Sequence, residues 1–108
     1  MEFNDLKKFI KIEDKRLRGR FGNYKDEEKR ILARTVKLGE EFGELCDEVL
    51  GYNSFQRQEK LDNRDAENLG EEFADVMITI LLLAEVMGID VEKSLESKIN
   101  KINKRYEK

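Results

Sequence analysis

The chain has 108 residues, and 21 Lys and Arg residues against 24 Asp and Glu residues give it a formal net charge of −3 at pH 7. This length predicts one domain, residues 1–108, and so mild an acidic surplus argues against a stable nucleic-acid partner. The sequence has no histidine and one cysteine, Cys46, which excludes His-based catalytic triads, the common catalytic zinc sites and internal disulfide bonds. Any catalysis must therefore rely on carboxylates, on Lys and Arg side chains, and on a hard metal ion.

The spacing of apolar residues predicts two helices in the first half of the chain. A first helix is expected over about residues 4–17, and the glycine-containing segment 18–23 is expected to end it. A long second helix is expected over about residues 26–53, because apolar side chains recur every three or four positions from Ile31 to Val49.

Two more helices are expected in the second half of the chain. The segment 54–68 is polar and carries no decisive pattern. A third helix is expected over about residues 67–87 with Gly88 just past its end, and a fourth from the N-cap Asp90 to about Tyr106. No segment alternates with the period of a half-buried strand, and the chain has no proline to interrupt a helix. The sequence therefore predicts an all-α fold, a bundle of four or five helices.

The third predicted helix is apolar over nearly its whole circumference between Val76 and Met87. Such a helix must be buried on all sides, and three other helices of so small a chain rarely enclose it completely. We therefore expect a homo-oligomer in which a second copy of the chain covers the outer side of this helix.

The sequence also bears on the location of the protein. Its N-terminus lacks the apolar run of a secretory signal. The longest apolar stretch, residues 76–84, is interrupted by Thr79 and falls far short of the roughly 20 residues that a membrane span needs. We expect a soluble, cytoplasmic protein that does not associate with membranes.

A short sequence is repeated in the second and third predicted helices. The octad Leu-Gly-Glu-Glu-Phe-Gly-Glu-Leu at 38–45 recurs 31 residues later as Leu-Gly-Glu-Glu-Phe-Ala-Asp-Val at 69–76, and five of the eight positions are identical. At about 100° per residue, each octad places an acidic pair at the edge of its apolar stripe. Antiparallel packing of the two helices would therefore bring four carboxylates together: Glu41, Glu44, Glu72 and Asp75.

Four uncompensated carboxylates at short range repel one another and raise one another's pKa values. A divalent cation removes this penalty, and an all-oxygen ligand set selects Mg²⁺, or Mn²⁺, over zinc and copper. A ferritin-type di-iron site is disfavoured because its motif requires histidine. The alternative is that both acidic pairs lie on solvated helix faces, as is common in chains rich in Glu and Lys. The matched register of the two pairs favours the metal site.

The two acidic motifs resemble those of the MazG-like nucleoside triphosphate pyrophosphohydrolases of the all-α NTP pyrophosphatase superfamily. That family carries Glu-x-x-Glu on one helix and Glu-x-x-Asp on the next. Here the motifs are Glu41-Phe-Gly-Glu44 and Glu72-Phe-Ala-Asp75, with 27 residues, 45–71, between them. The resemblance spans about residues 31–106 and is loose over the first thirty residues. It implies a helical bundle of the all-α NTP pyrophosphatase type, completed by oligomerisation.

The resemblance also implies an activity. Members hydrolyse a nucleoside or deoxynucleoside triphosphate between the α and β phosphates with Mg²⁺, which yields a monophosphate and pyrophosphate and serves nucleotide-pool housekeeping. They are homodimers or homotetramers whose sites draw on more than one chain. Carried over to this sequence, the metal ligands are Glu41, Glu44, Glu72 and Asp75. A glutamate of the first pair, Glu41 or Glu44, is then the catalytic residue that orients or deprotonates the attacking water.

Basic and aromatic side chains are candidates for substrate contacts. Lys98 and Arg105 match the basic helix with which the family contacts the triphosphate, and Lys101 lies on the same stripe. The alternative is a solvated basic face that complements the C-terminus of the helix. Four aromatic residues near the predicted loops are candidates for stacking on the base, and the alternative is that they belong to the core: Phe21, Tyr24, Tyr52 and Phe55.

Two other functions remain open from the sequence. One is a relative that acts on phosphoribosyl-ATP, although the wording Glu-Glu-Phe-Gly-Glu-Leu fits the MazG-like branch better. The other is a non-catalytic helical adaptor that keeps the architecture without turnover. The presence of all four acids argues against this loss of activity.

Overall fold

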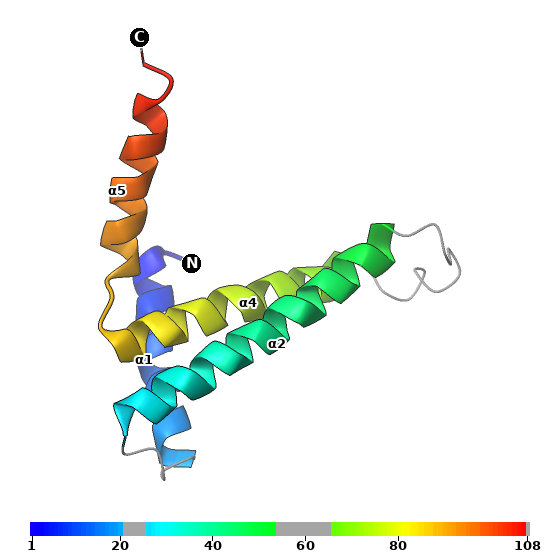
Figure 1. Ribbon diagram of the computed structural model, residues 1–108, viewed down its shortest axis with the longest axis vertical. Helices are drawn as coiled ribbons and strands as arrows, with labels where there is room; N and C mark the ends of the chain where they lie inside the picture. Colours follow the sequence, from blue (N-terminus) through cyan, green and yellow to red (C-terminus); the bar gives the residue numbers. More distant parts are fainter. Residues whose placement is uncertain (21–25, 54–65, 108) are drawn as a thin grey trace.

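The chain is entirely helical apart from its turns, over the residues that the computed structural model describes, 1–20, 26–53 and 66–107. Figure 1 shows the helices in chain order, with these bounds: α1, Phe3–Arg20; α2, Glu27–Asn53; α4, Ala66–Met87; α5, Val91–Lys104. The described residues contain no strand, so the all-α prediction is confirmed. The first helix runs to Arg20, past its expected end, because Gly19 does not adopt the left-handed conformation with which a glycine ends a helix.

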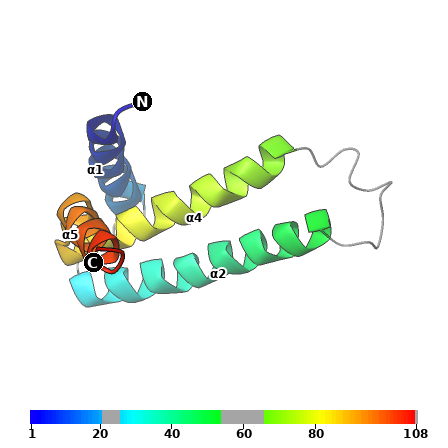
Figure 2. The ribbon, with the colours of Figure 1, turned by 90° about the horizontal axis from the view of Figure 1, so that it is seen from above.

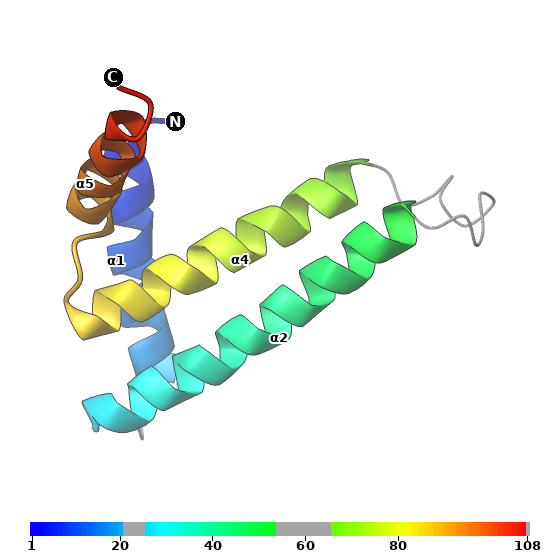
Figure 3. The ribbon, with the colours of Figure 1, turned by 45° about the horizontal axis from the view of Figure 1, so that its top comes forward.

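Helices α2 and α4 pack side by side as an antiparallel pair, which Figures 2 and 3 show from two directions. One hydrogen bond indicates their register: Arg34 Nη1 donates to the carbonyl oxygen of Leu82 at 2.7 Å. Because the helices run in opposite directions, residues seven positions after Arg34 and seven before Leu82 lie near one another. These residues are Glu41 and Asp75, so the pairing of α2 with α4 brings the two repeated octads together.

Helix α1 crosses one end of this pair and is held there by a buried ion pair. Arg34 Nη2 lies 2.6 Å from Asp14 Oδ1, and Arg18 Nε lies 3.0 Å from Asp14 Oδ2. Asp14 and Arg34 are both buried. Together with the bond to the Leu82 carbonyl, these contacts link α1, α2 and α4 through one guanidinium.

The apolar core is small and lies at this same end. Its buried members are Ile10 of α1 and Leu82, Ala84 and Val86 of α4. Further along the α2–α4 pair the apolar stripes are only partly covered, and Phe42 and Phe73 remain 55% and 51% exposed. Two helices alone cover only a narrow strip of each other, so these phenylalanines are not in the core of a single chain.

The turn between α4 and α5 follows the sequence-based expectation closely. Gly88 adopts a φ of 69°. Its backbone N–H donates to the carbonyl oxygen of Glu85, and the N–H of Ile89 donates to the carbonyl oxygen of Ala84. These two bonds form a Schellman motif, which needs the left-handed conformation that glycine adopts without strain. Asp90 then caps α5, because its Oδ1 accepts from the N–H of Lys93 at 3.0 Å.

Helix α5 projects away from the α2–α4 pair, as Figure 1 shows. It contains no buried residue, although it is clearly amphipathic. Its apolar side chains Leu95, Ile99 and Ile102 are all exposed, with Ile99 at 52%. A single chain thus leaves this apolar face uncovered.

None of the described helices is both long enough and apolar enough to cross a bilayer.

Candidate metal centre

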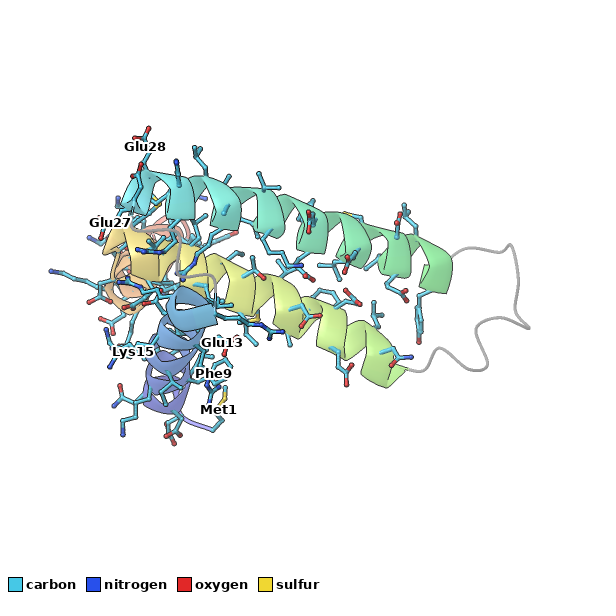
Figure 4. The ribbon with its side chains drawn as sticks, turned by 90° about the horizontal axis from the view of Figure 1, so that it is seen from below. Met1, Phe9, Glu13, Lys15, Glu27 and Glu28 are labelled. Carbon is cyan, nitrogen blue, oxygen red and sulfur yellow. The ribbon has the colours of Figure 1, made fainter. Side chains whose placement is uncertain are left out.

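Three of the four predicted metal ligands meet between the middle of α2 and the N-terminal half of α4. One carboxylate oxygen each from Glu41, Glu72 and Asp75 lies within 4.8 Å of the others. Figure 4 shows oxygen-bearing side chains of both helices between the two ribbons. Glu27 and Glu28, which it labels, lie at the end of α2 where α1 crosses. We call Glu41, Glu72 and Asp75 the acidic cluster.

Two oxygens of the acidic cluster are buried without a partner. Glu41 Oε2 and Glu72 Oε2 are inaccessible to solvent and accept no hydrogen bond from the described residues. A buried polar atom without a partner is costly, and more so when it carries charge. A divalent cation coordinated by these oxygens would remove that cost, so the side chains fit a hard metal ion such as Mg²⁺ or Mn²⁺.

The carboxylates of this region also perturb one another's protonation. The pKa of Glu72 is raised, first by partial burial and then by the negative charges of Asp75, Glu44, Glu41 and Glu48. Both causes disfavour the charged form, which is the form that binds a cation. The surrounding side chains therefore place Glu72 in an unfavourable electrostatic environment that a bound cation would relieve.

Glu44, the fourth predicted ligand, lies outside the acidic cluster. Its side chain is exposed, and none of its oxygens falls within the 4.8 Å that joins the other three residues. Its charge nevertheless lies close enough to raise the pKa of Glu72. Its roles as a ligand and as a catalytic residue stay predictions.

Lys37 is a neighbour of the acidic cluster that the sequence analysis did not single out. Its Nζ lies 3.3 Å from Glu41 Oε1 and 3.5 Å from Glu40 Oε2. The hydrogen bond to Glu41 is the main cause of a raised pKa for Lys37, so the ammonium stays charged. The signal was available, because a lysine four positions before a glutamate lies beside it on a helix.

The predicted phosphate-binding residues lie elsewhere in the chain. Lys98 and Lys101 are exposed on α5, and Arg105 is its C-cap. We call the part of the α2–α4 pair that carries the acidic cluster and runs on to the C-terminal end of α2 the acidic half. Figures 1 to 3 show that α5 leaves the pair at its opposite end. A single chain thus does not bring these cations to the acidic cluster, and their role in binding phosphate stays a prediction.

The aromatic candidates for base stacking are mostly outside the described residues. Phe21, Tyr24 and Phe55 fall in segments that the structure does not describe, as does most of the segment 54–68. Tyr52 lies near the end of α2 and is 47% exposed. Its role in stacking on the base stays a prediction.

A cavity of about 400 Å³ lies at the other end of the molecule, between α1, the end of α4 and the start of α5. Ion pairs cross its rim between Lys7 and Glu92 at 2.8 Å and between Lys11 and Glu85 at 3.3 Å. Glu85 follows Asp75 by ten residues, which is about 15 Å along a helix. The cavity is therefore separate from the acidic cluster.

The arrangement of the acidic cluster suits chemistry on phosphate esters and anhydrides. A divalent cation held by carboxylates polarises phosphoryl oxygens, and a free carboxylate beside it is able to take a proton from water. Neither function requires histidine.

Comparison with known families agrees with this chemistry. The profile of the MazG nucleotide pyrophosphohydrolase domain matches residues 29–108, which include nearly all of α2 and the whole of α4 and α5 and leave out α1. No curated protein and no solved structure matches the chain.

Proposed function

The chain belongs to the MazG nucleotide pyrophosphohydrolase family, and from this premise we propose that it hydrolyses a nucleoside or deoxynucleoside triphosphate at the α–β phosphate bond with Mg²⁺. The products are a nucleoside monophosphate and pyrophosphate, and the role is housekeeping of the cytoplasmic nucleotide pool. The observation that carries the proposal is the convergence of Glu41, Glu72 and Asp75 with two buried, unpartnered carboxylate oxygens.

The proposal assigns a role to each acid. Glu41, Glu72 and Asp75 hold the cation, and Glu44 completes the ligand set or acts beside it. When bound, the cation neutralises charge on the phosphates and lowers the pKa of water. Glu44, which is exposed next to Glu72, is suited to accept the proton of the attacking water. Water oxygen then forms a bond to phosphorus, the phosphoanhydride bond breaks, and pyrophosphate carries away the bonding electrons.

We also propose that the active form is a homodimer or homotetramer. The apolar side chains of α5 and the exposed Phe42, Phe73 and Met77 form faces that water does not favour. Lys98 and Arg105 reach an acidic cluster only if a second copy supplies them. Sedimentation at micromolar concentration tests this assembly, and a monomer would contradict it.

The direct test is release of pyrophosphate with Mg²⁺ from a panel of ribo- and deoxyribonucleoside triphosphates and phosphoribosyl-ATP. Glu72→Gln removes one charge of the acidic cluster at constant shape, and we expect at least about a hundredfold loss of kcat/KM. Glu71→Gln is the matched control, since Glu71 is the exposed neighbour of Glu72 and lies outside the cluster. We expect it to retain activity.

The outcomes separate the candidate functions. Pyrophosphate release from ordinary triphosphates supports the proposal, and release from phosphoribosyl-ATP alone supports the relative that acts on that compound. Absence of release from every compound, together with absence of metal binding, would leave the non-catalytic adaptor and overturn the enzyme.

A further inference from the structure

Lys37 is an exposed lysine that forms an ion pair with Glu41 of the acidic cluster. The two oxygens of Glu41 have different surroundings: Oε1 lies 3.3 Å from Lys37 Nζ, whereas Oε2 is buried and accepts no hydrogen bond from the part of the chain that the structure describes. The same carboxylate therefore meets an ammonium at one oxygen and offers a free lone pair at the other. The negative charge of Glu41 is only partly compensated in the apo protein.

The two partners differ in their freedom to move. The side chain of Lys37 is 58% exposed, whereas that of Glu41 is 12% exposed. Lys37 is thus able to leave Glu41 without breaking packed contacts, and its flexible stem lets the ammonium take new acceptors. Glu40, whose Oε2 already lies 3.5 Å from Lys37 Nζ, is a nearby exposed alternative acceptor.

We propose that Lys37 exchanges partners during the reaction: it neutralises Glu41 in the metal-free protein and contacts phosphate oxygens of the substrate once a divalent cation takes Glu41. The proposal rests on the proposed function, because it needs a cation at the acidic cluster and a polyphosphate beside it. It adds a substrate-contacting residue from α2 of the same chain.

Electrostatics gives the order of events. A cation at Glu41 and an ammonium 3.3 Å from the same carboxylate repel each other, so the cation competes with Lys37 for that charge. A polyphosphate that approaches the cation brings several negative oxygens to the position of the released ammonium. An ammonium that meets phosphate forms a charge-assisted hydrogen bond, which is stronger than a neutral one.

The first arm of the test measures Mg²⁺ binding by calorimetry without nucleotide. Lys37→Gln removes the competing charge, and we expect Mg²⁺ to bind about three- to tenfold more tightly at low ionic strength. Lys29→Gln, an exposed lysine at the start of the same helix, is the matched control, and we expect unchanged affinity. Unchanged or weaker binding in Lys37→Gln would overturn the partner exchange.

The second arm measures the phosphate contact with the intact enzyme. Lys37→Gln should raise KM about tenfold and weaken inhibition by added pyrophosphate by a similar factor, while kcat changes less. Lys37→Arg should recover most of the pyrophosphate inhibition, because it keeps a positive charge. Equal KM and equal inhibition in Lys37→Gln and the native protein would overturn the contact.

The two arms separate failure of this proposal from failure of the proposed function. A native protein that binds Mg²⁺ and releases pyrophosphate, with a Lys37→Gln variant that behaves identically, overturns the role of Lys37 alone. A native protein that binds no Mg²⁺ and releases no pyrophosphate overturns both.

Discussion

The two halves of the α2–α4 pair differ in whether their buried charges are compensated by a charge of opposite sign. At the end where α1 crosses, the buried carboxylate of Asp14 has two ion-pair partners, Arg34 and Arg18, and the guanidinium of Arg34 also donates to the carbonyl of Leu82. Asp14 Oδ1, like Glu41 Oε2 and Glu72 Oε2, accepts no hydrogen bond of good geometry from the described residues, but it lies 2.6 Å from a guanidinium nitrogen, so its charge is compensated. Glu41 lies seven residues after Arg34 along α2, about 10 Å away, and faces Glu72 of α4. Each of these two glutamates buries an oxygen that has no partner among the described residues. The first half contains the small apolar core, whereas the second leaves Phe42 and Phe73 exposed.

This difference indicates that one half of the pair stabilises the fold and the other half carries the candidate metal site. A buried charge with all its partners fixes the relative positions of helices, and a buried charge without them is costly unless a ligand binds. The half that holds α1 therefore sets the register of α2 against α4. In the acidic half, the same register brings carboxylates together without a positive charge between them. A bound cation, or a basic side chain from a second copy of the chain, would supply that charge.

The largest stability effect is expected from breaking the matched half. Arg34→Met leaves Asp14 buried with Arg18 as its remaining ion-pair partner, and loss of one partner of a buried pair costs about 3–5 kcal/mol. We expect urea denaturation in EDTA to show a loss of that order. The double variant Asp14→Leu/Arg34→Met should recover much of the loss, since it leaves neither charge unpaired. A single variant with native stability would show that the ion pair does not hold the helices together.

A smaller effect on folding and a large one on assembly are expected from the acidic half. Phe73→Ser removes an apolar side chain that is 51% exposed in one chain. We expect a loss of about 1 kcal/mol in the stability of a monomer, since about half of the side chain is buried there, but dissociation of the proposed oligomer. Sedimentation of the variant and the native protein measures the second effect. An unchanged dissociation constant of the oligomer would show that Phe73 lies outside the interface.

The smallest effect is a pH dependence from Glu72. Its folded-state pKa is raised above the ordinary value of about 4.3. Between these two values the folded protein binds more protons than the unfolded protein, so the free energy of unfolding rises as pH falls through that window. Denaturation in EDTA at several pH values should show this contribution, and Glu72→Gln should remove it. The same pH dependence in both proteins would contradict the placement of Glu72.

The sequence predicted the features that depend on local chemistry. Gly88 and Asp90 were expected to end one helix and cap the next, and they do so because a left-handed glycine and an aspartate N-cap act within a few residues. The meeting of Glu41 with Glu72 and Asp75 was also predicted, because the repeated octads share one helical register.

Two other features that depend on long-range packing were not predicted. The ion pair between Asp14 and Arg34 joins residues 20 positions apart on two helices, and no spacing rule links them. The position of Lys98 and Arg105 relative to the acidic cluster depends on the direction that α5 takes after Gly88. The pattern of α5 specifies an amphipathic helix, and what covers its apolar face is not encoded in that pattern.

Binding of Mg²⁺ to the metal-free protein tests the central claim most directly. Thermal unfolding is followed with and without Mg²⁺, and calorimetry gives the affinity. At a Mg²⁺ concentration of about 100 Kd we expect a stabilisation of about 2.7 kcal/mol and a clear rise in Tm. Glu72→Gln should lose this rise, and Glu71→Gln should keep it. A Tm that does not respond to Mg²⁺ in the native protein, or that responds equally in Glu72→Gln, would contradict the assignment of the acidic cluster as a metal site.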